Sequence, residues 1–130
     1  MFLVIDDQEE FRENLEAILS PHGEVFLAED GLSAWEIAKS KKFQIIITDY
    51  KMPHLDGISL IHAIRDKENP NQDTPIILLS GFLGQEEFSL DSVSNVQFAR
   101  KPFKLTQLQR LIRIASNGTI DPGSKGDMAS

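Results

Sequence analysis

Five polar side chains sit at or just after the ends of short, largely apolar runs. They are of the types that handle phosphate or a metal ion: Asp6, Asp7, Asp49, Ser80 and Lys101. Unbroken apolar runs such as 2–5 and 76–79 predict strands that are buried on both faces of a parallel sheet. In open α/β sheets, chemistry takes place just beyond the carboxyl ends of the strands. All five side chains are therefore candidates for one functional site.

Three of the five side chains are carboxylates, and these would repel one another if the fold brought them together unpaired. A hard cation removes that conflict. Mg²⁺ prefers an octahedron of oxygen ligands made of one or two carboxylates, waters and a substrate phosphate. We therefore expect Asp6, Asp7 and Asp49 to form a Mg²⁺ site. The alternative for Asp6 and Asp7 is that they only cap the following helix, where aspartate is favoured.

Asp49 is also a natural nucleophile, because a carboxylate can form an acyl phosphate by in-line attack. Lys101 and the hydroxyl of Ser80 would then hold two phosphoryl oxygens while the cation holds the third. Considered singly, a lysine is most often a solvated surface residue and a serine at a strand end a turn residue. Ser80 and Lys101 are therefore candidates only because they stand at the ends of predicted strands, as Asp49 does.

The apolar pattern predicts five strands that alternate with five helices. The expected strands are 2–5, 24–28, 43–48, 76–79 and 96–99. The expected helices are 9–19, 32–38, 58 to near 69, 84–95 and 105–115. The helix over 84–95 has the weakest support, because its serines, Asp91 and Asn95 compete for backbone hydrogen bonds.

This alternation predicts an α/β fold, a flavodoxin-like (βα)5 doubly wound parallel sheet with strand order 2-1-3-4-5. Such an order places the carboxyl ends of the first and third strands side by side at a switch point. Asp6, Asp7 and Asp49 would then converge, and Ser80 and Lys101 would line the same rim.

Composition restricts the classes of partner. The 130 residues carry a net charge of −7, from 20 acidic and 13 basic side chains, which argues against direct nucleic-acid binding. The absence of cysteine excludes disulfides and thiolate chemistry. No apolar run approaches the ~20 residues of a membrane span, so we expect no membrane insertion and a cytoplasmic location.

Taken in order, the motifs resemble those of the receiver domain of two-component response regulators, the CheY-like family. The similarity covers about residues 2–116. Each motif is a weak signal alone, and their combination in this order is specific. The matching elements are Asp6-Asp7, Asp49, Met52-Pro53, Asp56-Gly57, Ser80-Gly81 and Lys101-Pro102-Phe103.

The resemblance implies specific roles for the site residues. Asp7 and Asp49 would ligate Mg²⁺ directly, the backbone carbonyl of Lys51 would be the third protein ligand, and Asp6 would act through water. Pro53 and Gly57 would shape the loop after Asp49. A cis peptide bond would precede Pro102, a geometry that X–Pro bonds adopt at modest cost.

The resemblance also implies a signalling cycle. A sensor histidine kinase or a histidine phosphotransfer protein would phosphorylate Asp49, with at most self-catalysed phosphorylation and dephosphorylation. Ser80 would then move towards the phosphoryl group and Phe98 into the vacated space, switching the surface of helix 4, strand 5 and helix 5. The alternative for Phe98 is an ordinary core aromatic.

Three other functions compete with this one. An aspartyl-phosphate hydrolase of the haloacid-dehalogenase type needs a second acid two residues after its nucleophile, where Lys51 stands here. A flavodoxin-like cofactor binder needs a phosphate loop after the first strand, where Asp6 and Asp7 would repel phosphate. The complete set of site residues argues against a phosphorylation-independent scaffold.

For domain organisation we expect a receiver domain over 1–116 and a flexible tail or linker remnant over 117–130. That tail is too short for an output module. The cognate kinase, the downstream protein or output domain and the oligomeric state stay open.

Overall fold

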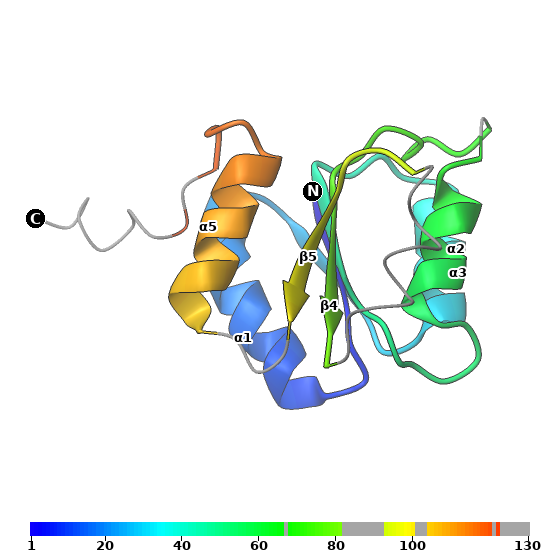
Figure 1. The fold of residues 1–130 in the computed structure, drawn as a ribbon, viewed down its shortest axis with the longest axis horizontal. Helices are drawn as coiled ribbons and strands as arrows, with labels where there is room; N and C mark the ends of the chain where they lie inside the picture. The colour runs from blue at the N-terminus through cyan, green and yellow to red at the C-terminus, as the bar shows by residue number, and fades with distance from the viewer. Residues whose placement is uncertain (67, 82–92, 101–103, 121, 123–130) are drawn as a thin grey trace, which may run out of the picture.

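A parallel sheet of five strands forms the centre of the computed structural model (Figure 1). The structure describes residues 1–66, 68–81, 93–100, 104–120 and 122. The strands are β1 (Phe2–Ile5), β2 (Val25–Ala28), β3 (Ile45–Asp49), β4 (Ile76–Ser80) and β5 (Val96–Arg100). Their order is β2-β1-β3-β4-β5, and every neighbouring pair is parallel. The predicted fold class and strand order are confirmed.

Helices cover both faces of this sheet (Figure 1). One face carries α1 (Glu9–Leu19) and α5 (Leu105–Ala115), and the other carries α2 (Gly31–Ala38) and α3 (Gly57–Ile64). A short 3₁₀ turn, Ser20–His22, follows α1. The predicted helix 84–95 falls largely on residues 82–92, which lie outside the described residues. Within the described residues, no helix has both the length and the apolar character needed to cross a membrane.

Helix α3 is shorter than predicted, since it ends at Ile64 instead of near residue 69. The Arg65 side chain donates hydrogen bonds to the carbonyl oxygens of Thr74 (2.7 Å), Ser94 (3.2 Å) and Asn95 (3.2 Å). Burial of this guanidinium lowers the pKa of Arg65 from its usual value. Residues 94 and 95 lie far from Arg65 in the chain, so helical periodicity could not reveal these contacts.

The sheet separates two hydrophobic cores. Phe2 and Val4 face the core beneath α1 and α5, whereas Leu3 and Ile5 face the core beneath α2 and α3. Because successive side chains of a strand point to opposite faces, a central strand with two covered faces must be apolar at every position. This requirement explains the uninterrupted apolar runs.

Packing continues beyond α5. Ile120 is 3% exposed and belongs to the core beneath α1 and α5. Its backbone N–H donates to Ser116 Oγ over 3.1 Å, which closes a turn after the helix. The packed chain therefore reaches at least Ile120, beyond the boundary expected at residue 116. The division into a domain and a tail stays a prediction.

Asn71 is a fully buried polar residue that joins three segments near the amino-terminal edge of the sheet. Its Oδ1 accepts from the Phe43 N–H (2.7 Å) and the Thr74 hydroxyl (3.0 Å). Its Nδ2 donates to the carbonyl oxygens of Ala38 (2.8 Å) and Lys41 (2.7 Å). One side chain thus connects the end of α2 with the entries to β3 and β4.

We predict that Asn71→Ala lowers the free energy of unfolding by about 3 kcal/mol, because it leaves several buried polar groups without partners. Urea denaturation measures this change. Asn14→Ala on the exposed surface of α1 is the matched control and should cost nothing, because alanine favours the helix. Equal stability of the two variants would contradict the assigned role of Asn71.

Candidate functional site

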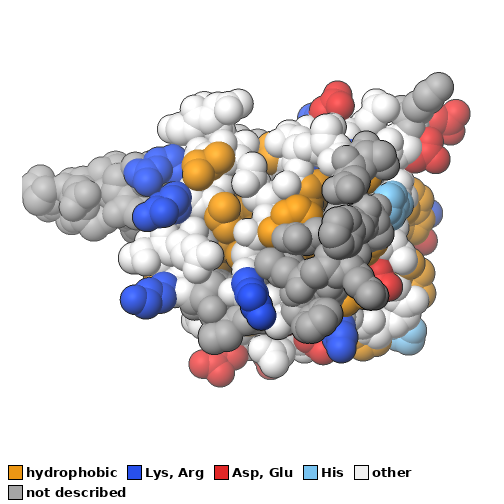
Figure 2. All heavy atoms as spheres, in the orientation of Figure 1, with side chains coloured by type: hydrophobic (Ala, Val, Ile, Leu, Met, Phe, Trp, Pro, Cys, Tyr) orange, Lys and Arg blue, Asp and Glu red, His pale blue; other side chains and the backbone are white. Residues whose placement is uncertain are grey.

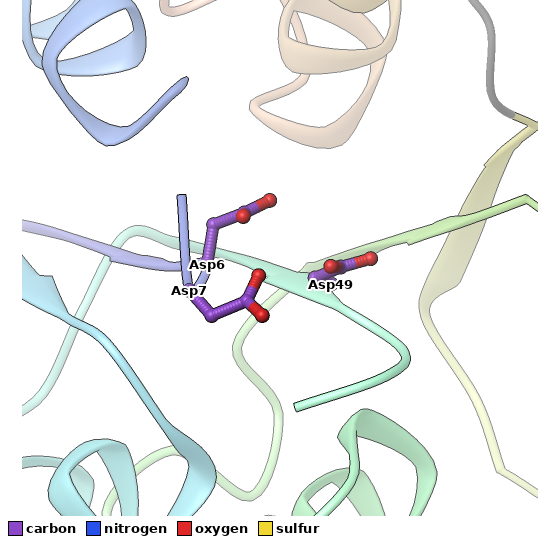
Figure 3. Close-up of side chains that lie close together, drawn as sticks. All are labelled: Asp6, Asp7 and Asp49. Carbon is purple, nitrogen blue, oxygen red and sulfur yellow. The ribbon is translucent and has the colours of Figure 1, made fainter. Parts of the chain in front are cut away.

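Three carboxylates converge at the carboxyl edge of the sheet (Figure 3). Asp6, Asp7 and Asp49 each offer an oxygen, and these oxygens all lie within 4.8 Å of one another. Asp6 is 0% exposed and Asp49 is 8% exposed, whereas Asp7 is open to solvent. The structure therefore brings together the three acids that the sequence nominated.

The pairing of β1 with β3 produces this convergence. Ile5 lies opposite Thr48 in the parallel register, so the next residues along the two strands are Asp6 and Asp49. The N–H of Asp6 donates to the Ala28 carbonyl of β2 over 3.1 Å, which holds the end of β1 between its two neighbours. The positions of the acids are thus set by backbone hydrogen bonds.

The turn after β1 is fixed by side chains as well as by backbone. The Gln8 N–H donates to Asp6 Oδ1 over 2.9 Å, and the Nη1 of Arg12 donates to the Asp6 carbonyl oxygen over 2.6 Å. Arg12 is a site-proximal residue that the sequence pattern does not single out. Its place at the end of the first turn of α1, close to Asp6 and Asp7 in the chain, is a sequence signal that could have suggested it.

The loop after β3 is fixed by tight backbone contacts. The Gly57 N–H donates to the Tyr50 carbonyl over 2.7 Å, and the Tyr50 N–H donates to Asp49 Oδ1 over 2.9 Å. Asp56 caps α3 by accepting the Ser59 N–H over 2.7 Å. These contacts hold the loop that contains Lys51 and Pro53 against the end of β3, and both of those side chains are exposed.

The same loop also packs against the start of α2. Gly31 lies so close to the Leu55 carbonyl oxygen that a Cβ at this position could not be accommodated. Asp30 caps α2 by accepting the Ser33 N–H over 2.8 Å, and this hydrogen bond lowers the pKa of Asp30 from its usual value. The β3–α3 loop is therefore held from two sides.

Ser80 and Phe98 occupy the end of β4 and the middle of β5. Ser80 is 1% exposed, and it lies two residues after Leu78, which pairs with Phe98 in the parallel register. Because alternate residues share a face, Ser80 and Phe98 lie on the same side of the sheet. Phe98 is half-buried against the core beneath α2 and α3. Lys101 and Pro102 lie outside the described residues.

The chemistry of the acidic cluster fits a hard divalent cation. The oxygens of the three carboxylates lie within 4.8 Å of one another, and a divalent cation among them would offset the repulsion of their like charges. Three carboxylates also form the all-oxygen donor set that Mg²⁺ prefers. Asp6, Asp7 and Asp49 could therefore hold such an ion.

Comparison with known proteins identifies the family. The sequence profile of the response regulator receiver domain matches residues 2–113. The response regulator MprA of Mycolicibacterium vanbaalenii is 30% identical, with 98% of this chain and 55% of that protein covered. A chemotaxis protein CheY homolog of Campylobacter jejuni is 33% identical, with 65% of this chain and 67% of that protein covered.

Solved structures agree with this result. The receiver domain of the Francisella response regulator 1452 superposes with a TM-score of 0.76 at 28% identity, covering 92% of this chain and 98% of that one. The receiver domain of the sensor histidine kinase PA1611 from Pseudomonas aeruginosa superposes with a TM-score of 0.74 at 32% identity, covering 89% and 96%. That structure has a magnesium ion coordinated in its active site cleft.

The chain belongs to the response regulator receiver domain family of two-component signalling. Receiver domains are signalling domains, and as a class they are not counted among enzymes. The chain spans about a quarter and about half of the length of the first two curated relatives that it matches, since it covers 27% and 55% of them.

Gly57 provides a test of how the loop after β3 is held. A Cβ at this position would collide with the Asp49 carbonyl oxygen and would lie 3.0 Å from Leu78 Cδ1. We predict that Gly57→Ala lowers the free energy of unfolding by about 2–4 kcal/mol, because the loop must move away from β3.

Chemical denaturation measures this loss, and Gly81→Ala is the matched control. Among the described residues, and apart from the chain neighbours of Gly81, no heavy atom lies within 4 Å of a hypothetical Cβ at this position, so that substitution should be tolerated. A Gly57→Ala variant as stable as Gly81→Ala would show that the close approach is not required.

Proposed function

We propose that this chain is a phosphoacceptor whose Asp49 receives a phosphoryl group and thereby switches a signalling surface. The observation that carries the proposal is the convergence of Asp6, Asp7 and Asp49 at the carboxyl edge of a receiver fold. Asp49 is at the end of a strand, where its carboxylate can be approached from beyond the sheet.

In the proposed reaction, a carboxylate oxygen of Asp49 attacks the phosphorus of a phosphohistidine. An oxygen–phosphorus bond forms, the phosphorus–nitrogen bond breaks, and the imidazole leaves with the electron pair and takes up a proton. The products are an acyl phosphate and a free histidine. Little covalent chemistry is required of the protein, so positioning and charge stabilisation dominate.

A Mg²⁺ ion would be held directly by Asp7, Asp49 and the backbone carbonyl of Lys51, with Asp6 acting through water. When bound, it would neutralise the negative charge that accumulates on the transferring phosphoryl group. The presence of magnesium in the related receiver domain of PA1611 supports this assignment.

Ser80 and Lys101 would hold the remaining phosphoryl oxygens, and Ser80 would also begin the switch. The location of Ser80 and Phe98 on one side of the sheet, with Phe98 paired to Leu78, supports coupled movement of these two side chains. A cis peptide bond before Pro102 is part of the same proposal, and Pro53 and Gly57 would keep the metal-binding loop in place.

The switched surface would comprise the segment between β4 and β5, β5 itself and α5. Its α5 portion carries exposed Arg110 and Arg113 and a half-exposed Ile114, and Figure 2 shows basic side chains gathered over this helix. A downstream protein or an output domain would read this surface. The phosphoryl donor would be a sensor histidine kinase or a histidine phosphotransfer protein in the cytoplasm.

The phosphoacceptor is tested by mass spectrometry after incubation with acetyl phosphate and Mg²⁺. The parent protein should gain one phosphoryl group per chain, and Asp49→Ala should gain none because the nucleophile is gone. Asp73→Ala, an exposed acid at the opposite edge of the sheet, should behave as the parent does. Undiminished labelling of Asp49→Ala would refute the proposal.

The cation site has its own test. Asp7→Asn should weaken Mg²⁺ binding by about tenfold or more, because the charge of the ligands sets divalent affinity. Without Mg²⁺, the same variant should unfold at a higher temperature, because one of three mutually repelling charges is removed.

Isothermal titration calorimetry and thermal unfolding measure these two effects. Glu10→Gln, an exposed residue in the first turn of α1, has the same change of charge and should alter neither by a comparable amount. If Asp7→Asn and Glu10→Gln bind Mg²⁺ equally well, Asp7 is not a ligand.

A further inference from the structure

Arg12 makes an unusual choice of hydrogen-bond partner. It is partly buried on α1, and its Nη1 reaches back by six residues to the carbonyl oxygen of Asp6 over 2.6 Å. That oxygen belongs to Asp6, which directly follows β1 and is the first residue of the acidic cluster. A charge-assisted hydrogen bond of this length is among the stronger polar contacts in proteins.

Carboxylates lie closer in sequence but do not capture this guanidinium. Glu9 and Glu16 are placed three residues before and four residues after Arg12, positions from which helical side chains can form ion pairs. Within the described part of the chain, however, Arg12 forms an ion pair with neither Glu9 nor Glu16. Arg12 is therefore committed to the backbone of the β1–α1 turn.

The turn that Arg12 contacts carries two of the three acids of the cluster. Asp6 and Asp7 both emerge from it, and the Gln8 N–H fixes only the Asp6 side chain directly. Repulsion among the three carboxylates acts to open the turn. The hydrogen bond from Arg12 opposes that opening at the Asp6 carbonyl.

We propose that Arg12 is a positioning residue that holds the β1–α1 turn closed so that Asp6 and Asp7 present a preformed site to a divalent cation. The inference rests on the proposed Mg²⁺ site, and it assigns to that site a supporting residue that touches neither the cation nor the phosphoryl group.

The direction of the change in Mg²⁺ affinity distinguishes a positioning role of Arg12 from a purely electrostatic effect of its charge. Arg12→Met removes a positive charge next to a cation site, and Coulomb's law alone then predicts tighter Mg²⁺ binding. Loss of positioning predicts weaker binding, by roughly tenfold, the lower end of the effect seen when outer-shell partners of metal ligands are removed. Methionine keeps most of the apolar stem of arginine, so packing changes little.

The experiment measures the Mg²⁺ dissociation constant by calorimetry in the unphosphorylated protein, with Lys42→Met as the control. Lys42 is exposed before β3, at the opposite edge of the sheet, and its replacement makes the same change in net charge. We expect Arg12→Met to bind more weakly than both the parent and Lys42→Met, and Arg12→Lys to recover part of the affinity because an ammonium can still donate to the carbonyl.

Equal or tighter binding by Arg12→Met overturns the inference. Thermal unfolding without Mg²⁺ verifies that the variants are folded. If Arg12→Met does not fold, Arg12→Lys compared with the parent decides the question at constant charge, and unchanged affinity in Arg12→Lys overturns the inference.

A phosphorylation assay separates the proposed role of Arg12 from the proposed phosphoacceptor function of Asp49. If Arg12 acts through the cation, labelling of Arg12→Met by acetyl phosphate should be slower at low Mg²⁺ and should reach the parent rate at saturating Mg²⁺. If the parent is not labelled at Asp49, the proposed function fails, whereas the comparison of Mg²⁺ affinities still judges Arg12.

Discussion

Mutual repulsion of Asp6, Asp7 and Asp49 is the constraint to which the carboxyl edge of the sheet is adapted. Two of these acids are almost fully buried, where an uncompensated carboxylate is costly, and their oxygens approach within 4.8 Å. A hard cation at this site, as proposed above, would turn that repulsion into binding. The hydrogen bonds around the cluster keep its geometry in place.

Backbone atoms carry much of that restraint. The Asp6 carbonyl is held by Arg12, and the Gly57 N–H holds the Tyr50 carbonyl next to Asp49. Gly31 lets the start of α2 approach the β3–α3 loop at Leu55. The proposed switch residues lie on other strands, Ser80 on β4 and Phe98 on β5. In the proposed function, the loops that these contacts restrain would bind the phosphoryl group, and Ser80 and Phe98 would report it.

Sequence patterns predicted the strands well, because strands buried on both faces must be apolar at each position, as in β1 and β4. They placed the end of α3 too late, near residue 69 instead of at Ile64. They also carried no signal for contacts between segments far apart in the chain, such as those of Arg65 with the carbonyl oxygens of Ser94 and Asn95, or of Ile120 with the core beneath α1 and α5. Helical or strand periodicity carries no information about such partners.

By itself, the sequence determined which chemical groups end the strands and which runs must be buried, because side-chain type and apolar periodicity are local properties. It also contained the motifs that place the chain among receiver domains. Only the tertiary structure decided that Asp6 and Asp49, far apart in the chain, become neighbours, because that result follows from the register of β1 on β3. The roles of Asn71 and Arg12 were decided there as well, since their partners are backbone atoms that only the folded chain brings within hydrogen-bonding distance.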